Sequence, residues 1–210
     1  MKGFYLIDKK KGVTSFDVVR EIRRKTGEKR VGHAGTLDPL ATGLLIVAVG
    51  RENTRELGKF LKSDKEYVVS AKFGSVSDTY DSEGKVEECD VLKKCSRKEV
   101  EELIEREFLG EIDQVPPKYS ALKVGGRKAC DVMRKGGDVE LTSRKVKVYK
   151  FDVIEFKWPV VTFKVACGSG TYIRSLVHDL GQKLGCGAYV AELRRTKVGD
   201  YSVEDAGKIF

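Results

Sequence analysis

The chain has 210 residues, of which 40% are hydrophobic and 34% are charged, a balance that excludes a disordered tail. No apolar run reaches the ~20 residues that span a bilayer, and the first residues lack the apolar core of a signal peptide. We therefore expect a cytoplasmic protein that forms one domain over residues 1–210, and the formal charge of +8 favours a polyanionic partner such as nucleic acid.

The first predicted helix lies between Thr14 and Gly27. Thr14 followed by Asp17 resembles a capping box, and a glycine commonly ends a helix. The spacing places three apolar residues on one face: Phe16, Val19 and Ile22. It turns a set of cations outward, and two more follow the helix: Arg20, Arg23, Arg24, Lys25, Lys29 and Arg30.

Two further helices and six strands are predicted beyond this helix. One helix starts at Ser96 with Glu99 and stops at Gly110, and another covers about 171–184. Strand patterns lie at 4–7, 44–49, 67–73, 146–156, 160–166 and 189–193. Only three residues link 146–156 to 160–166, too few for a parallel crossover, so this pair is a predicted antiparallel hairpin. The sequence thus predicts an α+β fold with a mixed, mostly antiparallel sheet flanked by helices.

No cofactor or metal motif accompanies these elements. The glycines at 168 and 170 belong to neither a G-x-G-x-x-G nor a G-x-x-x-x-G-K-[ST] pattern, which argues against a dinucleotide or phosphate-loop enzyme. Five cysteines are scattered without a C-x-x-C pair or a nearby histidine, so we expect reduced thiols and no zinc site.

The segment 32–43, GHAGTLDPLATG, is the most unusual stretch of the chain. Its glycines indicate sharp turns or a close approach of another group to the backbone. Asp38 precedes a proline and is flanked by Leu37 and Leu40, and a desolvated carboxylate is a better nucleophile or base. The residues alone leave a second interpretation open, in which Asp38 only turns the chain and His33 is a hydrogen-bonded loop residue.

Residues 32–45, GHAGTLDPLATGLL, resemble the signature loop of the TruB family of tRNA pseudouridine synthases, which isomerise a uridine in the T-loop of tRNA, at position 55. Other segments resemble that family in the same order along the chain: DKKKGVTS at 8–15, KEY at 65–67, DTYDSEG at 78–84, QVPPKYSA at 114–121, GTYIRSL at 170–176 and LRRT at 193–196. The resemblance covers nearly the whole chain and implies the pseudouridine synthase catalytic fold.

The resemblance also implies a catalytic residue. Asp38 matches the family's essential aspartate, which attacks the uridine at the base or at the ribose. Arg174 matches the arginine that pairs with this aspartate and orients it. Tyr67 matches the tyrosine that stacks on the flipped base, and Tyr172 stands where the family places another aromatic residue. Without the motif, two such tyrosines would be ordinary core or surface residues.

Three further substrate-binding residues come from the same resemblance. His33 matches the histidine that helps to displace the target uridine, and Leu193 matches a leucine that lines the pocket. Lys9 matches a lysine of the family's first motif, where Lys10 replaces the usual proline. The chemistry agrees with this assignment, because isomerising a base within RNA requires the nucleotide to leave its stack.

The expected partner is the T-arm stem-loop of tRNA, bound by a monomer without cofactor, metal, membrane or obligate protein partner. The family's C-terminal RNA-binding PUA domain has no expected counterpart before Phe210. Two alternatives remain: an RNA-binding or RNA-folding module that uses the pocket without turnover, and a relative of the guide-RNA-dependent synthases. The presence of Asp38 favours an enzyme, and the basic helix favours direct recognition of RNA.

Overall fold

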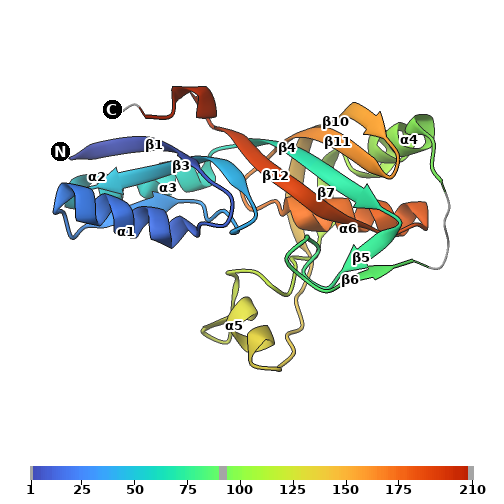
Figure 1. The fold of residues 1–210 in the computed structure, drawn as a ribbon, viewed down its shortest axis with the longest axis horizontal. Helices are drawn as coiled ribbons and strands as arrows, with labels where there is room; N and C mark the ends of the chain where they lie inside the picture. Colours follow the sequence, from blue (N-terminus) through green and yellow to red (C-terminus); the bar gives the residue numbers. More distant parts are fainter. Residues whose placement is uncertain (1, 90–93, 208–210) are drawn as a thin grey trace.

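A computed structural model describes residues 2–89 and 94–207 of the chain. A long sheet runs through the molecule in the strand order β1-β3-β12-β4-β11-β10-β7, with β2 paired to β3 and β13 paired to β12 (Figure 1). Its strands are β1 (Gly3–Lys9), β2 (Val31–Ala34), β3 (Thr42–Val49), β4 (Lys65–Phe73), β7 (Gly110–Gln114), β10 (Arg144–Lys157), β11 (Val160–Cys167), β12 (Ala188–Val198) and β13 (Tyr201–Ser202).

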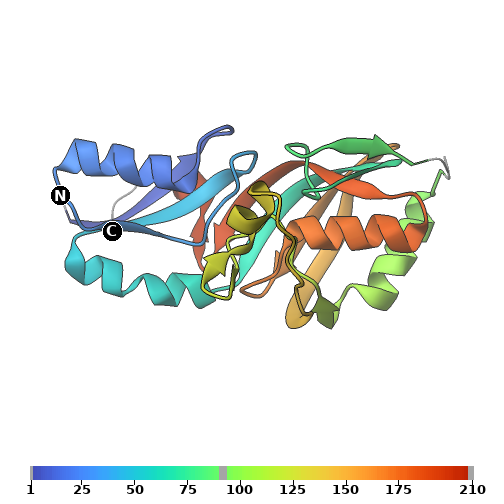
Figure 2. The same ribbon diagram turned by 90° about the horizontal axis from the view of Figure 1, so that it is seen from below.

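Helices cover the two halves of this sheet separately. The first half carries α1 (Ser15–Thr26), α2 (Arg51–Arg55) and α3 (Leu57–Lys62), and the second half carries α4 (Arg97–Glu107) and α6 (Ile173–Leu184), as Figure 2 shows. A short helical turn, η1 (Val203–Asp205), follows β13. None of the helices within the described residues is long and apolar enough to cross a membrane.

The two halves meet where β3 pairs with β12. This pairing is parallel, whereas the other pairings of the sheet between described strands are antiparallel. Its register joins Thr42 to Arg194 and Gly43 to Arg195. Gly43 has a φ of +100°, and a Cβ there would lie 2.2 Å from the carbonyl oxygen of Arg195. Glycine is therefore required at this junction.

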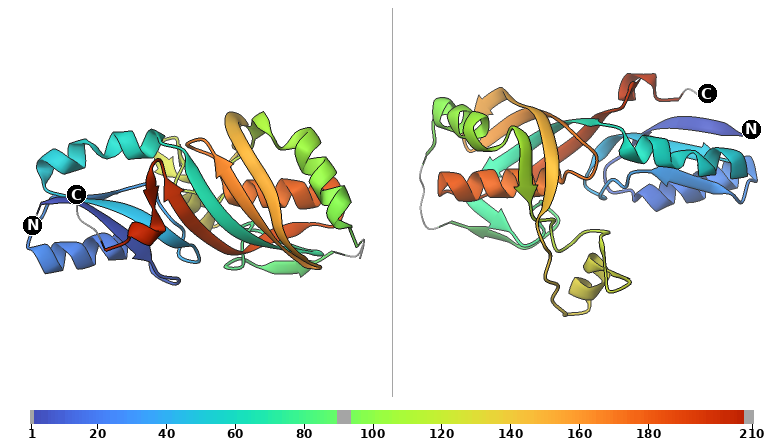
Figure 3. Two further views of the ribbon diagram at one scale, coloured as in Figure 1. Left: turned by 90° about the horizontal axis from the view of Figure 1, so that it is seen from above. Right: turned by 180° about the vertical axis from the view of Figure 1, so that it is seen from behind.

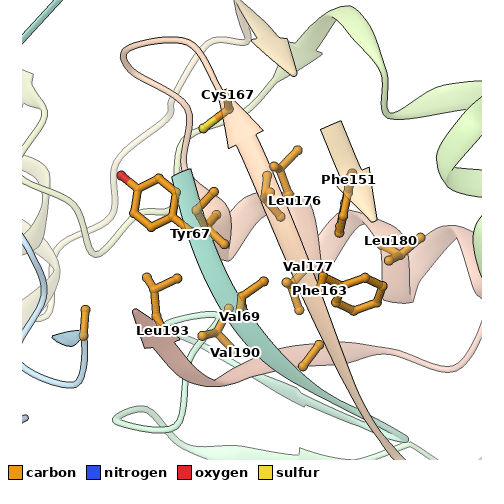
Figure 4. Packing of buried hydrophobic residues seen from close by; sticks show 14 of the residues in the cluster. Tyr67, Val69, Phe151, Phe163, Cys167, Leu176, Val177, Leu180, Val190 and Leu193 are labelled. Carbon is orange, nitrogen blue, oxygen red and sulfur yellow. The ribbon is translucent and has the colours of Figure 1, made fainter. Parts of the chain in front are cut away.

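The main core forms between the second half of the sheet and α6. Alternate residues of β4 point inward, among them Tyr67, Val69 and Phe73, because strand side chains alternate between faces. Leu176 and Leu180 of α6 pack against them, and Figure 4 shows these residues around Val69 and Phe163. The sheet thereby fixes the position of α6, which carries Arg174 near its first turn.

Strand β3 is buried on both faces. Leu44, Ile46 and Ala48 pack with Phe60 of α3, while the residues between them pack with Val19 of α1. Figure 3 shows this half and its helices α1, α2 and α3 from above and from behind. A continuous apolar run from Leu44 to Val49 is typical of such a strand.

A small lobe projects from the body between β7 and β10 (Figures 1 and 2). It contains the hairpin β8 (Lys123–Val124) and β9 (Arg127–Lys128) and the helix α5 (Ala129–Arg134). A second hairpin, β5 (Ser75–Ser77) with β6 (Val86–Glu88), encloses the DTYDSEG segment. The sequence patterns did not predict these elements.

The predicted helices and the long hairpin are confirmed. Both halves of the capping box form at Thr14, and Gly27 ends α1 with a φ of 68°. A second capping box forms between Ser96 and Glu99. α4 ends earlier than predicted, since its C-cap is Phe108. β10 and β11 form the expected antiparallel hairpin.

Two predictions about α1 are wrong. Phe16 is 54% exposed and does not belong to the buried face, which Val18 joins in its place. Ser15 is buried and bonded through its hydroxyl to Leu37, which fixes the rotation of the helix. Arg23 is half-buried, not turned outward, and donates to the Val31 carbonyl at 3.0 Å.

Candidate active site

A cavity of about 370 Å³ lies at the junction of the two halves. Five of the predicted site residues line it: Asp38, Tyr67, Tyr172, Arg174 and Leu193. They come from the loop after β2, from β4, from the start of α6 and from β12. The volume is within the range of small-ligand pockets, ~300–1,000 Å³. His33 and Lys9 are not among the residues that line the cavity.

Asp38 and Arg174 form an ion pair in this cavity, with Arg174 Nε 3.1 Å from Asp38 Oδ2. The Arg174 side chain is 5% exposed and that of Asp38 is 36% exposed. Burial raises the pKa of the Asp38 carboxyl above its ordinary value, and the Arg174 charge opposes this rise. The nearby Asp81 carboxylate adds to it. The pair thus presents a partly desolvated, oriented carboxylate to the cavity.

Arg174 is held on every side of its guanidinium group. Nη1 donates to the Thr79 carbonyl at 2.8 Å and lies 3.3 Å from Asp81 Oδ2, and Nη2 donates to the Tyr119 carbonyl at 2.9 Å. Asp81 is 2% exposed, and its carboxylate also accepts bonds from Thr79 Oγ1 and the Glu83 amide. One cation therefore lies between two carboxylates, and its planar group can point in only one direction.

The Asp38 loop is attached to the N-terminal segment. Lys9 is 1% exposed, and its Nζ donates to the carbonyls of Val13 at 2.6 Å and Pro39 at 3.4 Å. Burial lowers the pKa of Lys9, an effect that the Asp38 charge opposes. Ser15 Oγ both donates to the Leu37 carbonyl and accepts from its amide. Lys9 thus supports the loop from behind and does not contact the cavity.

Arg195 supports the other side of the same loop. It is 1% exposed, and it donates from Nε to the Leu44 carbonyl at 2.7 Å and from Nη2 to the Gly35 carbonyl at 3.0 Å. Its guanidinium also lines the cavity near Tyr67. Burial raises the pKa of the Tyr67 hydroxyl, and Arg195 opposes that rise. The tyrosine therefore stays neutral at physiological pH.

Tyr67 and Leu193 lie at the end of the hydrophobic core that faces the cavity. Figure 4 shows the two side chains next to each other, with the Tyr67 hydroxyl directed away from the apolar residues. Lys65, two residues earlier on β4, donates from Nζ to three carbonyls at the end of α3, including that of Leu61 at 2.7 Å. Burial lowers the pKa of Lys65 to about 8.

Tyr172 is fixed by Gln114, the last residue of β7. The amide of buried Gln114 donates to the Tyr172 carbonyl at 3.0 Å, and its oxygen accepts from the Tyr172 amide at 2.8 Å. The Arg144 guanidinium lies 4.8 Å from the centre of the Tyr172 ring and donates to the Gly170 carbonyl. An aromatic ring and the cation that lies over it therefore line the cavity together.

His33 lies on β2, outside the cavity lining. Its Nδ1 is buried and has no hydrogen-bond partner among the residues that the structure describes. Burial, and then the Arg195 charge, lowers the pKa of His33 below its ordinary value. The ring is therefore neutral at physiological pH.

Sequence reasoning assigned no role to three residues that hold this site. Asp81, Gln114 and Arg195 all occur in motifs that were recognised, yet only Asp38, its matched partners and Lys9 were singled out. The sequence gives one indication for Arg195: it lies two residues after buried Leu193 on β12, and alternate residues of a strand share a face. Nothing local indicates that Asp81 and Gln114 reach α6.

Taken together, the geometry suits covalent chemistry on a flat ring. A carboxylate that a buried arginine orients can act as a nucleophile. Tyr67 and Tyr172 supply aromatic faces in the same cavity, and such faces stack on nucleobases. The formal charge of +8 adds attraction for a polyanion.

Comparisons with known proteins identify the family of the chain. The model of the TruB family pseudouridylate synthase N-terminal domain matches residues 23–173, and that of the tRNA pseudouridylate synthase B C-terminal domain matches residues 174–209. The chain is 43% identical over 207 residues to tRNA pseudouridine synthase B of Protochlamydia amoebophila, covering 98% of this chain and 77% of that protein. It is 45% identical over 206 residues to the protein of the same name from Clostridium tetani, covering 98% and 71%.

Solved structures share the fold. A chain in the crystal structure of a Cbf5-Nop10-Gar1 complex aligns with a TM-score of 0.73 and 33% identity, covering 95% of this chain and 50% of that one. A chain in the structure of an H/ACA RNP bound to a substrate RNA containing 2'-deoxyuridine aligns with a TM-score of 0.70 and 30% identity, over 95% and 48%. The chain thus spans about half the length of these solved chains. Its family-model matches and its curated relatives establish that the chain belongs to the TruB family of pseudouridylate synthases.

Proposed function

We propose that this chain isomerises a uridine in the T-loop of tRNA, at position 55, to pseudouridine, with Asp38 as the catalytic nucleophile. The observation that carries the proposal is the ion pair between Asp38 and buried Arg174 in a cavity lined by two tyrosines. The names of the curated relatives support tRNA as the substrate class.

The reaction replaces the bond between a ribose carbon and a base nitrogen with a bond from the same carbon to a ring carbon. The base must leave the RNA stack before a side chain can reach this bond. Tyr67 stacks on the flipped base, Leu193 packs beside it, and Tyr172 bounds the other side of the cavity. No electrons are gained or lost overall, so the proposed reaction needs no redox cofactor.

Arg174 sets the state of the nucleophile. Its charge opposes the rise in the Asp38 pKa that burial causes, which keeps the carboxylate ionised for attack. Thr79, Asp81 and Tyr119 fix the guanidinium, so Arg174 also fixes the direction in which the Asp38 carboxylate points. Pre-orientation of this kind lowers the entropic part of the barrier.

Two predicted binding residues act from outside the cavity. Lys9 holds the Asp38 loop through the Pro39 carbonyl, so its role in binding is indirect. His33, neutral and beside the loop, assists displacement of the target uridine from its stack.

We assign residues 1–210 to one catalytic domain that acts in the cytoplasm as a monomer, without an obligate protein partner. The higher identity to tRNA pseudouridine synthase B than to chains of the H/ACA complexes supports this choice.

A purified chain tested alone separates this proposal from its alternatives. The substrate is an unmodified T-arm stem-loop, and the matched control carries cytidine in place of the target uridine. We expect pseudouridine at the target position and none in the control. Tight binding without conversion would indicate an RNA-binding module instead. Conversion that requires added guide RNA and proteins would indicate a guide-dependent enzyme.

A further inference from the structure

Tyr80 adopts a backbone conformation that is unfavourable for its residue type. Its φ is 64°, and it is the single non-glycine residue with a positive φ among the described residues. A bulky side chain rarely occupies this left-handed region unless the surroundings hold it there. Tyr80 stands between Thr79 and Asp81, the two residues of the DTYDSEG segment that contact Arg174.

The Tyr80 ring stacks on His178 of α6. The ring centres are 3.7 Å apart and the planes differ by 11°. The Nδ1 atom of His178 is buried and meets no hydrogen-bond partner within the described part of the chain. His178 contacts Tyr80 through the face of its ring. Burial lowers the pKa of His178, which favours the neutral form of the ring.

Arg174 and His178 occupy positions i and i+4 of the same helix, so they lie one turn apart on one face. α6 thus contacts three consecutive residues of the loop. Arg174 binds the Thr79 carbonyl and the Asp81 carboxylate, and His178 holds the ring of the residue between them. Beyond this, the loop is attached to β12 through the Tyr80 carbonyl and the Ser82 amide, both bonded to Val190 at 3.0 Å.

These two backbone bonds hold the loop at one point of β12, and the side-chain contacts of Arg174 and His178 hold it to α6. The Thr79 carbonyl and the Asp81 carboxylate of this loop, together with the Tyr119 carbonyl, hold the Arg174 guanidinium toward Asp38. A loop that moved along α6 would carry both acceptors away from Arg174.

We propose that the Tyr80–His178 stack is a positioning device for catalysis: it fixes the loop along α6 so that Asp81 and Thr79 aim Arg174 at Asp38. Tyr80 and His178 are positioning residues and contact neither reacting group. This inference rests on the proposed function, because the aim of Arg174 matters only if Asp38 attacks the substrate.

Four variants separate the stack from other properties of the two residues. H178A removes the stack and H178F restores an aromatic face without nitrogen atoms. Y80G removes the ring and also relieves the positive φ, whereas Y80F keeps the ring. Q182A, at an exposed position one turn further along α6, is the matched control.

Conversion of the T-arm stem-loop is measured for each variant together with thermal unfolding. We expect H178A and Y80G to lower kcat about tenfold with KM within about twofold, because a small misplacement of reacting groups slows chemistry more than binding. H178F, Y80F and Q182A should stay within about twofold of the unaltered chain. A purely structural role predicts a different result, in which H178A and Y80G lower the unfolding temperature and leave kcat unchanged.

Hydrogen exchange provides a readout that does not depend on activity. Without RNA, the amides of Ser82 and Glu83 should exchange faster in H178A than in the unaltered chain, and at the original rate in H178F. Equal kcat for H178A and the unaltered chain, or equal exchange, would overturn the inference. An inactive unaltered chain would instead contradict the proposed function, and the exchange data would still test the stack. If H178A does not fold, the comparison of Y80G with Y80F decides.

Discussion

Replacing Gly43 with alanine should strongly destabilise the protein, because Gly43 lies where the two halves of the sheet join. An alanine Cβ would lie 2.2 Å from the Arg195 carbonyl oxygen and 2.8 Å from the Arg195 nitrogen. Both are backbone atoms of β12, so no side chain can rotate away. To reach an ordinary contact of 3.4 Å the strands must separate by about 1.2 Å, which breaks the parallel pairing.

The expected cost combines two effects. Overpacking of this kind costs about 1–3 kcal/mol, and a non-glycine residue at a φ of +100° costs about 1–3 kcal/mol more. The free energy of unfolding should therefore fall by about 2–6 kcal/mol, a large part of the ~5–15 kcal/mol of a typical domain.

Urea denaturation followed by circular dichroism measures this change. Gly58→Ala is the matched control, since Gly58 lies in α3 and a Cβ added there would meet no other atom within 4 Å. That substitution should stabilise the chain by about 0.5–1 kcal/mol, as glycine disfavours helices. An unfolding free energy for Gly43→Ala within about 1 kcal/mol of the unaltered chain would refute the reasoning about the junction.

Three further predictions concern the site and its approach. Arg174→Lys should lower kcat about hundredfold while the RNA affinity changes little, because one ammonium cannot make the four contacts of the guanidinium. Saturation kinetics measure kcat, and a binding titration measures the affinity. Activity should rise with pH through the pKa of Asp38, because the carboxylate must be ionised and burial raises its pKa above 3.8. Arg174→Met should move this acid limb to higher pH, because it removes the charge that opposes the increase in the Asp38 pKa. An unmoved acid limb in the kcat/KM profile would contradict the assignment. Replacing exposed Arg24 and Lys29 with alanine should reduce the slope of the log–log salt dependence of RNA binding by about 1.4, at about 0.7 per contact. Replacing Lys98 on α4 should leave this slope unchanged. Equal slopes for the double variant and the unaltered chain would show that Arg24 and Lys29 face only solvent.

Features that depend on neighbours in sequence were predictable. The capping boxes at Thr14 and Ser96 need only residues three positions apart, and the short link between β10 and β11 fixes an antiparallel hairpin by length alone. The continuous apolar run of β3 likewise indicates a buried strand. These signals are local, so the sequence contains them directly.

Features that depend on distant contacts were not predictable from pattern. Phe16 has helical spacing with Val19, but the bond from Ser15 to Leu37 rotates it into solvent. Arg195 is a charged residue in a strand, which usually indicates exposure, and only the carbonyls of Leu44 and Gly35 explain its burial.

The site itself shows the same division. The Asp38 segment attracts attention because of its composition, but its pairing with Arg174 was expected from resemblance alone, since the two residues lie far apart in the chain. The motif that contains Asp81 does not indicate its role, because only the fold brings its loop to α6. The projecting lobe was missed, since strands as short as β8 and β9 leave no periodic signal.

The most direct test of the account is Asp38→Asn, assayed under single-turnover conditions on the T-arm stem-loop. Asparagine keeps the size and shape of the side chain, so Arg174 and the cavity should remain in place. We expect no pseudouridine, while the dissociation constant for RNA stays within about tenfold, because the lost group acts in bond making and not in ground-state attraction. Pseudouridine formed by the purified variant at a rate near that of the unaltered chain would contradict the role of Asp38.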